Sequence, residues 1–598
     1  MKLIALVSIA SALAAQDGRV LYDRNCSFCH GADAKGGERG PALGARADLA
    51  AVIRNGFPEK GMPASRLSAA EIDAMAAHVR SIAGPAAKQG SGGFAAVRAG
   101  DWPTYHGVVG GNRHSSLDQI NVANVAKLAP QWIFTIPGVP KLQVTPVVLN
   151  GVMYVTAPNE AYALDATSGK QLWRFRRPRT QGLAGDAASG INRGVAVLDS
   201  RVFLVTDNAH LLALDRANGE LLWDTEMADG KQNYGSTSAP LVVKDLVIAG
   251  ISGGDEGARG FLAAYRIDTG KEVWRFWTIP KPGEPLSETW KGKDLEHGCG
   301  TTWLTGTYDA SLDLVYWPTG NPCPDYNGDE RIGDNLYTDS ILALDRATGK
   351  LRWYYQYTPH DLWDWDSVQV PMLVDAPWQG QNRKLLLQAN RNGFFYVLDR
   401  ESGKLLRATP FVKKLTWASG IDLATGRPQL LPNSAPSKEG AKTCPAVEGA
   451  TNWMSTAYSP ATGLFYLTAL EKCGMYFKAE DTWKPGESYY GGFTKRVPGD
   501  NPRKYLRAID LSTGKVAWDL EQDGPASTWG GVLSTGGGVV FFGHDSGDFA
   551  AADARTGKLL WRFPANQQWK ASPMTYMSGG KQYVAIASGP AILAFAVR

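Results

Sequence analysis

Hydrophobic residues follow two different spacings along the chain, and the change falls near residue 85. Before that point, Ser68 and Glu71 form a capping box. Hydrophobic residues at helical spacing follow it: Ile72, Met75, Ala76, Val79 and Ile82. Beyond it, strand-like runs alternate with glycine-containing turns. We therefore predict a small all-α domain at 16–84, a Gly/Ser/Pro-rich linker at 85–100 and a β domain at 101–598.

One 11-residue pattern recurs seven times in the β domain, at 163–173, 213–223, 264–274, 343–353, 397–407, 508–518 and 551–561. Each copy combines a strand end, a turn that contains Asp and closes on Gly, and a new strand that ends in Trp. Only the fifth copy ends differently, in Arg407. Close copies are about 50 residues apart, which is the length of a four-stranded propeller blade. The repeated Trp is expected to pack against the neighbouring blade.

A long interval separates the fifth and sixth copies. It contains GIDLATGRP (420–428) and AYSPATGLFYL (457–467), which look like a degenerate further blade. Seven copies and one degenerate copy predict an eight-bladed β-propeller. The alternative, a set of unrelated hairpins, does not account for seven matches of this length.

The first 15 residues carry one Lys, an apolar stretch and an Ala-Leu-Ala end, as a cleaved signal peptide does. A buried helix or a retained anchor is the alternative. No later segment approaches the roughly 20 apolar residues that a membrane helix needs, so we expect a periplasmic protein without a transmembrane segment. The net charge of +4 comes with no basic run, and we therefore expect no nucleic-acid partner.

The strongest chemical signal is Cys26-Ser27-Phe28-Cys29-His30. Cys26 and Cys29 can form thioethers with the two vinyl groups of a haem, and His30 can then bind the iron. Met62, on a Gly-Met-Pro loop, is the candidate for the second axial ligand. A zinc or dithiol site is the alternative, but only His78 lies nearby to complete it. We predict a cytochrome c domain with covalent haem c.

Polar residues that the repeat does not explain gather in eight segments: 192–194, 252–260, 297–303, 319–327, 358–367, 390–400, 451–453 and 528–531. In this order they resemble the PQQ-dependent alcohol dehydrogenases, the family of methanol and ethanol dehydrogenases. The resemblance covers roughly residues 100–598. It implies an eight-bladed propeller with PQQ and a metal ion on its axis.

The resemblance also implies a role for each matching residue. Trp303 would lie flat against the PQQ ring, and Arg391 would stand beside its reactive oxygens, where a positive charge stabilises the reduced form. The PQQ carboxylates and carbonyls would be held by Arg193, Thr237, Asn452, Trp529 and Gly530.

The metal ligands implied by the resemblance are Asp255, Asn321 and Asp364, and Asp364 would also be the general base. Asp366 is typical of the lanthanide-using relatives. A further hard carboxylate suits a trivalent ion, so we expect a lanthanide in preference to Ca²⁺. The alternative is that Asp361, Asp364 and Asp366 form a solvated acidic loop.

The chain departs from the family pattern in two further places. Asp255 stands where the family has Glu, so the backbone must approach the metal or Glu256 must compensate. Ala187 and Ala188 replace the adjacent cysteines whose disulfide covers one PQQ face, and the small-residue loop around them is then expected to cover it.

Four cysteines remain in the large domain. The spacing of Cys444 and Cys473 resembles a family disulfide, and an even count in an exported protein predicts a second one between Cys299 and Cys323.

These features together predict a dehydrogenase that oxidises a small alcohol. Electrons would pass from PQQ to haem c and on to an external acceptor such as a soluble cytochrome. A sugar or a polymeric alcohol is the alternative substrate. A non-catalytic propeller scaffold is the alternative of a different class.

Overall fold

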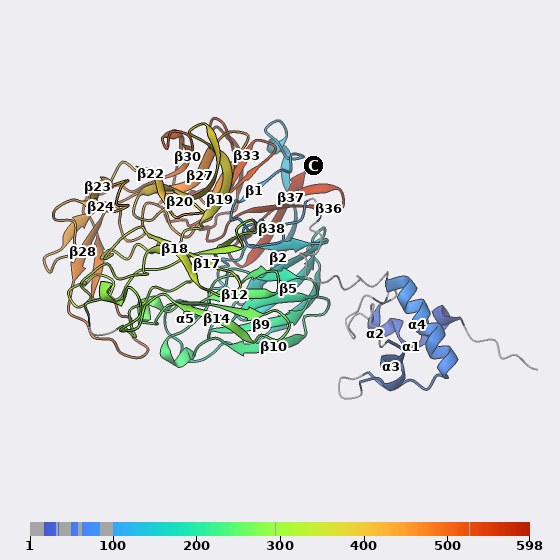
Figure 1. Cartoon of the computed structure of the whole chain (residues 1–598). Coiled ribbons are helices and arrows are strands. Elements are labelled where there is room, and N and C mark those ends of the chain that lie inside the picture. Colours follow the sequence, from blue (N-terminus) through green and yellow to red (C-terminus); the bar gives the residue numbers. More distant parts are fainter. Residues whose placement is uncertain are drawn as a thin grey trace, which may run out of the picture. The chain divides into compact units, whose positions relative to one another are not determined.

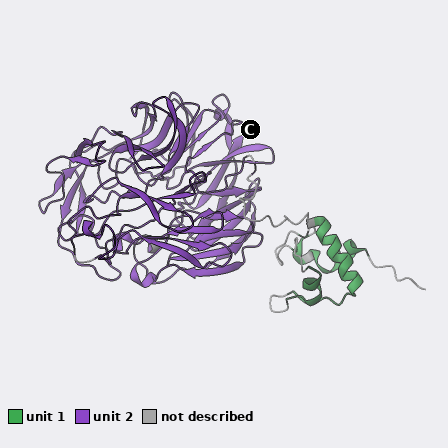
Figure 2. Ribbon diagram, viewed as in Figure 1, with its two compact units in different colours: residues 1–93 green, residues 94–598 purple. Residues whose placement is uncertain are grey.

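The computed structural model describes residues 17–31, 34, 43, 49–57, 62–83, 98, 100–292, 295–525 and 527–598. The chain divides into two compact units, Met1–Gly93 and Phe94–Arg598 (Figure 2). The predicted signal peptide lies outside the described residues, as does most of the predicted linker. Within the described ranges, no helix is both long and apolar enough to cross a membrane.

Helices form the first unit (Figure 1): α1 (Gly18–Asn25), α2 (Ser27–His30), α3 (Leu49–Asn55) and α4 (Ala69–Ala83). The predicted capping box opens α4, because the Ser68 backbone N–H donates to Glu71 Oε2 at 2.9 Å. The predicted apolar face of α4 is buried in the core of this unit, with Met75 and Val79 fully inaccessible. The helix predicted from hydrophobic spacing is thus confirmed.

Strands dominate the second unit, which confirms a mainly β chain. Its described residues form eight sheets of four or five strands. Five consist of four consecutive strands: β3 (Val147–Leu149), β4 (Val152–Ala157), β5 (Glu160–Asp165) and β6 (Gln171–Arg176); β7 (Ala196–Leu198), β8 (Arg201–Val205), β9 (His210–Asp215) and β10 (Leu221–Glu226); β11 (Leu241–Val243), β12 (Leu246–Gly250), β13 (Phe261–Arg266) and β14 (Glu272–Trp277); β15 (Thr307–Asp309), β16 (Leu314–Pro318), β17 (Ser340–Asp345) and β18 (Leu351–Gln356); β19 (Met372–Trp378), β20 (Gln381–Ala389), β21 (Phe394–Asp399) and β22 (Leu405–Pro410).

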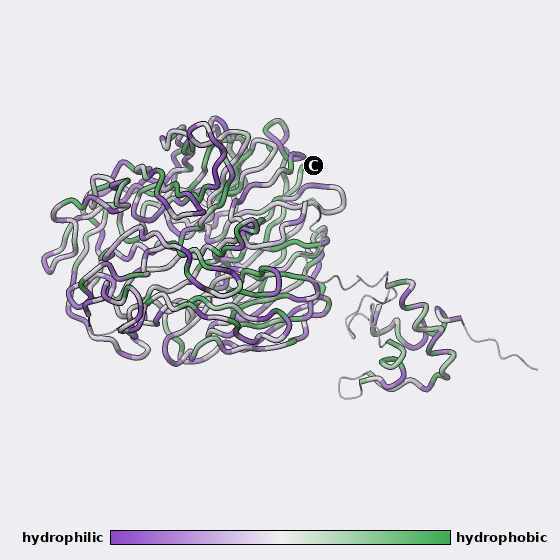
Figure 3. Tube along the Cα trace, in the orientation of Figure 1, coloured by the Kyte–Doolittle hydropathy of each residue, from purple (hydrophilic) through white to green (hydrophobic). Residues whose placement is uncertain are grey.

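The other three sheets bring together strands that are further apart in the chain: β26 (Ala457–Ser459), β27 (Leu464–Glu471), β30 (Arg503–Asp510) and β31 (Val516–Gln522); β32 (Val532–Thr535), β33 (Val539–Gly543), β34 (Asp548–Asp553) and β35 (Leu559–Pro564) with β1 (His114–Ser115); β2 (Leu128–Thr135) with β36 (Met574–Ser578), β37 (Lys581–Ser588) and β38 (Ala591–Val597). The short helices of this unit are α5 (Gly185–Ser189), η2 (Val125–Lys127), η3 (Gly230–Gln232), η4 (Gly254–Glu256) and η5 (Ser287–Thr289). Hydrophobic stretches run through the inner part of the unit, while many peripheral turns are hydrophilic (Figure 3).

Each of the seven repeat copies spans a strand end, a turn and a new strand, as predicted, and these two strands are the last two of one sheet. In the first copy, Asp165 Oδ1 accepts from the Ser168 N–H at 2.8 Å within the turn. The Trp at the end of a copy packs on the turn glycine of the next. A Cβ placed on Gly219 would lie 2.7 Å from Trp173, whose Nε1 donates to Arg216 O at 2.9 Å. Packing of the Trp against the neighbouring sheet is confirmed.

The fifth copy makes the same contact with an arginine. Arg407 Nη1 donates to Leu511 O at 2.7 Å, and a Cβ on Gly514 would lie 2.7 Å from Arg407 Cδ. The aliphatic stem covers the glycine as the indole does elsewhere, and the guanidinium supplies the hydrogen bond.

The predicted degenerate blade between the fifth and sixth copies is wrong. The segment 420–428 lies in a two-stranded hairpin of β23 (Ala418–Ile421) and β24 (Pro428–Leu430). The segment 457–467 falls in β26 and β27, which belong to the sheet of the sixth copy. A three-stranded sheet, β25 (Ala441–Thr443), β28 (Gly474–Lys478) and β29 (Gly492–Arg496), fills the rest of the interval.

The eighth sheet is instead closed by β2, which pairs antiparallel with β38 (Figure 1). Trp132 of β2 packs on Gly169 of the first copy, since a Cβ there would lie 2.5 Å from the indole. The 11-residue repeat does not include β2, so the pattern could not reveal this strand.

Both predicted disulfides are present, Cys299–Cys323 and Cys444–Cys473.

Candidate active site

A cavity of about 270 Å³ brings together residues that are far apart in the chain. Eight of the predicted site residues line it: Arg193, Asp255, Trp303, Asp364, Asp366, Arg391, Asn452 and Trp529. They lie just before the first strands of sheets or just after second strands, as Trp303 does before β15 and Arg391 after β20. Because first and second strands are antiparallel, these positions meet at one end of the sheets.

The cationic and aromatic part of the wall is built around Arg193, which is buried. Its Nη1 donates to Thr237 Oγ1 at 2.6 Å, and its guanidinium lies 5.0 Å from the Trp303 ring and 4.9 Å from the Trp453 ring. Thr237 Oγ1 donates in turn to Trp303 O at 3.3 Å. Thr237 therefore orients both Arg193 and Trp303.

Asp366 holds together the part of the cavity wall that contains Arg391 and Trp303. Its Oδ2 pairs with Arg391 Nη1 at 2.6 Å, and its Oδ1 accepts from Trp303 Nε1 at 3.0 Å and from the Asn321 N–H at 3.3 Å. Arg391 Nη2 lies 3.7 Å from Asp364 Oδ1. One carboxylate thus fixes the indole and the guanidinium that face the cavity.

Carboxylates crowd this end of the cavity. Burial raises the pKa of Asp364 well above its ordinary value; Arg391 opposes the shift, while Asp255 and Asp366 add to it. Burial likewise raises the pKa of Asp325, with further contributions from Asp255, Asp364 and Asp366. The negative charges destabilise one another in a way that a bound cation would relieve.

The donor set at this end also suits a hard cation. Asn321 Nδ2 donates to Asp325 Oδ1 at 3.0 Å, and Asp325 Oδ2 is buried without a hydrogen-bond partner in the described part of the chain. Carboxylate and amide oxygens are the ligands that calcium-like ions prefer. Among the described residues, no three His, Cys, Asp or Glu side chains are grouped so as to hold a metal ion by themselves, so the fit rests on the chemistry of these donors.

Asp361 does not line the cavity, and the alternative of a solvated acidic loop is wrong. It is fully buried, and its two carboxylate oxygens accept from the N–H groups of Trp363 (3.0 Å) and Trp365 (2.7 Å). It shapes the loop, whereas Asp364 and Asp366 face the cavity.

Asn452 and Gly530 are held mainly by backbone contacts. Asn452 Nδ2 donates to Glu448 O at 2.9 Å, and its Oδ1 accepts from the Trp453 N–H at 2.8 Å. Gly530 O accepts from Thr468 Oγ1 at 3.0 Å.

Sequence reasoning missed several residues that line the cavity: Gln143, Ile191, Trp453 and Lys570. Lys570 Nζ lies 5.1 Å from the Trp529 ring, and burial, with Lys141 and Lys504 nearby, lowers the pKa of Lys570 to about 8. Position in the sheets could have found them. Gln143 stands four residues before β3 and Lys570 four before β36, the place that Trp303 holds before β15.

The positions expected to carry a small-residue covering loop lie instead in α5. Ala188 is exposed, and Ile191, just after the helix, lines the cavity. Glu256 also lines the cavity, but its carboxylate lies against α5, because a Cβ on Gly185 would be 2.3 Å from it.

In the first unit, α2 places Cys26, Cys29 and His30 on one helical turn. The N–H groups of Cys29 and His30 donate to Cys26 O at 3.1 and 2.9 Å. Both cysteines are free thiols, and burial raises the pKa of Cys26 to about 11. Met62 is fixed by two backbone hydrogen bonds with Phe57, at 2.8 and 3.1 Å, and packs against the core of this unit.

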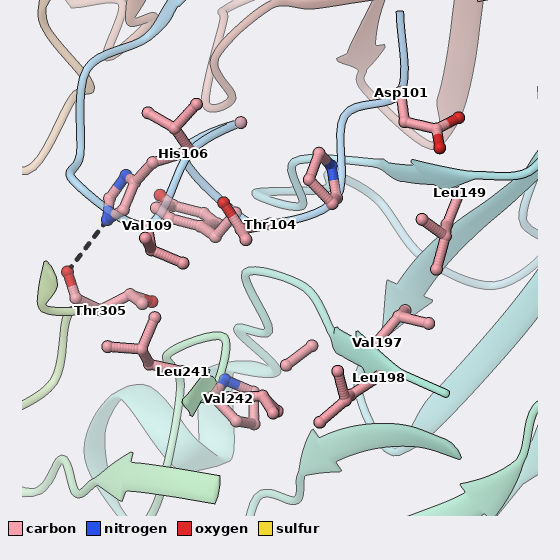
Figure 4. Close-up of a pocket in the computed structure, with 16 residues that line it drawn as sticks. Asp101, Thr104, His106, Val109, Leu149, Val197, Leu198, Leu241, Val242 and Thr305 are labelled. Carbon is pink, nitrogen blue, oxygen red and sulfur yellow. Dashed lines mark hydrogen bonds between the residues drawn. The ribbon is translucent and has the colours of Figure 1, made fainter. Parts of the chain in front are cut away.

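A larger cavity of about 370 Å³ contains none of the predicted site residues. Aliphatic side chains such as Leu149, Leu198 and Val242 line it (Figure 4). His106 Nε2 lies 3.2 Å from Thr305 O, and burial and Arg113 lower the pKa of His106 to about 3. The imidazole is neutral at physiological pH, and this cavity offers no paired acid and base.

Comparisons with known proteins agree with this geometry. Residues 102–413 and 502–584 match the PQQ family model, described as glucose/ethanol/alcohol dehydrogenase, beta-propeller domain. Residues 13–79 match the model of the cbb3-type cytochrome c oxidase subunit III. Quinohemoprotein alcohol dehydrogenase ADH IIB of Pseudomonas putida is 39% identical over 522 residues, covering 83% of this chain and 75% of that protein.

Two solved structures are also similar. Quinohemoprotein alcohol dehydrogenase from Comamonas testosteroni has a TM-score of 0.79 and 34% identity, over 84% of this chain and 81% of that one. A europium-containing methanol dehydrogenase has a TM-score of 0.77 and 31% identity, over 83% of this chain and 98% of that one.

The chain therefore belongs to the PQQ-dependent alcohol dehydrogenases, in the form that carries a cytochrome c domain. The non-catalytic scaffold is excluded as an interpretation, and the chain is an enzyme.

Proposed function

We propose that this enzyme is a periplasmic quinohaemoprotein that oxidises a small primary or secondary alcohol and passes the electrons through haem c to an external acceptor such as a soluble cytochrome. We interpret the eight sheets as eight propeller blades and the first unit as an all-α cytochrome c domain. The signal-like residues 1–15 support export. The cavity that gathers eight predicted residues at one end of the sheets carries the proposal.

The cavity fits PQQ, a flat molecule with several carboxylates. Trp303, fixed through Asp366 and Thr237, offers the flat face, and Arg193 and Lys570 offer cations for the carboxylates. Asn452 and Trp529 also line the cavity and would contribute to the hydrogen-bonding edge, and Gly530 follows Trp529 in the chain.

Bound PQQ supplies the two-electron acceptor for the hydride that leaves the alcohol carbon. Asp364 would take the hydroxyl proton, because its carboxylate faces the cavity with Arg391 Nη2 3.7 Å from Oδ1. Arg391 would supply a positive charge to stabilise reduced PQQ, because its ion pair with Asp366 holds the guanidinium at the cavity.

Asp255, Asn321 and Asp364 would bind the metal ion, with Asp366 as a further carboxylate. We propose a lanthanide in preference to Ca²⁺. Asp366 adds one more hard oxygen, and the similar methanol dehydrogenase structure contains europium.

In the first unit, Cys26 and Cys29 would carry the haem, with His30 and Met62 as axial ligands. A single helical turn presents the first three together, and a thioether ligand favours ferrous iron.

Reconstitution of the full chain with PQQ and either La³⁺ or Ca²⁺ tests the proposal over an alcohol panel. Dye reduction with an alcohol is expected, together with reduction of the haem in its absorbance spectrum. A chain that binds haem and PQQ yet oxidises no alcohol would contradict the proposal. The proposal of a lanthanide would be contradicted if the enzyme were active with Ca²⁺ alone and if Asp366→Ala left this activity unchanged.

A further inference from the structure

Asp255 reaches the cavity from η4, and the backbone around it is held on all sides. The Tyr489 N–H donates to Asp255 O at 2.6 Å. The next carbonyl, Glu256 O, accepts from Trp483 Nε1 at 2.9 Å and from Asn233 Nδ2 at 2.8 Å. Tyr489 and Trp483 belong to the loop 479–491, between β28 and β29. This loop therefore holds η4 in place by hydrogen bonds.

The Cys299–Cys323 disulfide lies behind the same turn. Both sulfur atoms contact Gly254 O, at 2.8 Å for Cys299 and 3.1 Å for Cys323. The disulfide is buried and shares a hydrophobic cluster with Tyr489 and Trp483. It therefore supports η4 without lining the cavity itself.

The disulfide also joins the two segments that carry other cavity residues. Cys299 precedes Trp303 by four residues, and Cys323 follows Asn321 by two. Between the segments, the Gly300 N–H donates to Asn321 O at 2.8 Å. One cross-link thus ties Asp255, Trp303 and Asn321 to a common support.

Glycines on either side of η4 allow neighbouring residues to pack closely against the turn. A Cβ on Gly253 would lie 2.0 Å from Asn233 O, and one on Gly257 would lie 2.3 Å from Trp483 Cδ1. Both residues have positive φ, +103° and +79°, which favours glycine. The backbone therefore stays close to the cavity.

We propose that the Cys299–Cys323 disulfide and the loop 479–491 position Asp255 for the metal and make the shorter aspartate sufficient there. The proposal rests on the proposed metal site. Aspartate is one methylene shorter than glutamate, so its carboxylate reaches the ion only when the backbone is held forward. The disulfide and the loop are positioning elements and take no part in the reaction.

Metal binding by the full chain loaded with PQQ tests this directly. Equilibrium dialysis against La³⁺ and Ca²⁺, with bound metal measured by mass spectrometry, gives the affinity. In Cys299→Ala/Cys323→Ala, the metal affinity is expected to fall by about 10- to 100-fold, as loss of outer-sphere support does elsewhere. The matched control is Cys444→Ala/Cys473→Ala, which removes a disulfide that does not contact η4 and keeps the affinity.

A compensating substitution at Asp255 distinguishes a role of the disulfide in positioning this side chain from a general loss of stability. In the intact protein, Asp255→Glu is expected to weaken metal binding, because the longer side chain overfills a site with a fixed backbone. Without the Cys299–Cys323 disulfide, the same substitution is expected to restore part of the lost affinity. Trp483→Phe removes the hydrogen bond to Glu256 O but keeps an aromatic ring in the loop. It is expected to weaken binding by a smaller factor, and this test does not depend on disulfide formation during folding.

Equal affinity in the two disulfide variants, or the absence of any recovery by Asp255→Glu, would overturn the positioning role. Asp255→Ala tests the underlying metal site separately. If Asp255→Ala leaves the metal affinity unchanged, Asp255 is not a ligand and the proposed metal site itself fails.

Discussion

The two cofactor sites proposed for this chain are built in opposite ways. The haem residues Cys26, Cys29 and His30 lie on one helical turn. The PQQ cavity draws residues from Gln143 to Lys570, one or two from each of several sheets. A local site depends on one turn of backbone, whereas a distributed site depends on the packing of every sheet against the next. Changes to the first are expected to stay local, and changes to the second to spread.

Removal of the thioether cysteines has the largest expected effect and tests the independence of the units. Cys26→Ala/Cys29→Ala is expected to lose covalent haem completely, because no thiol remains to hold it. Alcohol-dependent reduction of an artificial dye by the second unit is expected to persist. Haem staining after denaturing electrophoresis and a dye assay measure both. Ser27→Ala, in the same turn, is the control and keeps the haem. Parallel loss of dye reduction would show that the units depend on one another.

Asp364→Asn is expected to lower kcat by about 10²- to 10⁴-fold, because the amide cannot take the hydroxyl proton. PQQ content and haem spectrum should stay unchanged, which the absorbance of the purified protein measures. Asp361→Asn is the matched control from the same loop. It weakens the bonds to Trp363 and Trp365 and is expected to lower the unfolding temperature more than kcat. An equal loss of kcat in both variants would contradict the assignment of Asp364 as the general base and of Asp361 as a residue that only shapes the loop.

Gly219→Ala tests how far a packing change spreads. The new methyl group would meet Trp173, so about 1–3 kcal/mol of stability is expected to be lost beyond the backbone cost. Gly463→Ala is the control, because Gly463 has a similar φ of +70° and nothing within 4 Å of the added Cβ. PQQ affinity is expected to fall in Gly219→Ala alone, since Arg193 precedes the sheet that contains Gly219 and Thr237 precedes the next sheet. Denaturant unfolding and PQQ titration measure the two effects. Equal losses in both variants would mean that the Trp contact contributes nothing.

Lys570→Met has the smallest expected effect, about a tenfold loss of PQQ affinity, as for one hydrogen bond to a charged group. The pKa of Lys570 in the free site is about 8, and a bound carboxylate would raise it. PQQ affinity is therefore expected to be full below pH 8 and to fall as the pH rises above it. Lys570→Met should lose this dependence. Lys141→Met removes one charge that lowers the Lys570 pKa and should move the decline to higher pH. A pH profile identical in all three proteins would exclude Lys570 as a ligand.

The same contrast explains what could be predicted from the sequence. The haem motif and the Trp repeat are local patterns, and the repeat identified the outer hairpins of seven sheets. The eighth sheet was mispredicted because β2 meets β38 from the far end of the chain, and no local pattern records that pairing. Trp303 and Asp364 were found by resemblance. Lys570 belongs to no sequence motif. It lies at the cavity because it precedes β36, the first strand of its blade in the chain after residue 570.

The pairing of β2 with β38 also sets an order of events for a chain made from its N-terminus. Until the segment up to Val597 has emerged, β2 exposes an unpaired edge, and Trp132 lacks the β38 residue with which it pairs, Ala594. Such an edge is a template for pairing with other chains. Completion of the second unit therefore waits for the synthesis of β38, and a product that stops before Ala591 has the residues of the cavity wall but lacks the strand that pairs with β2.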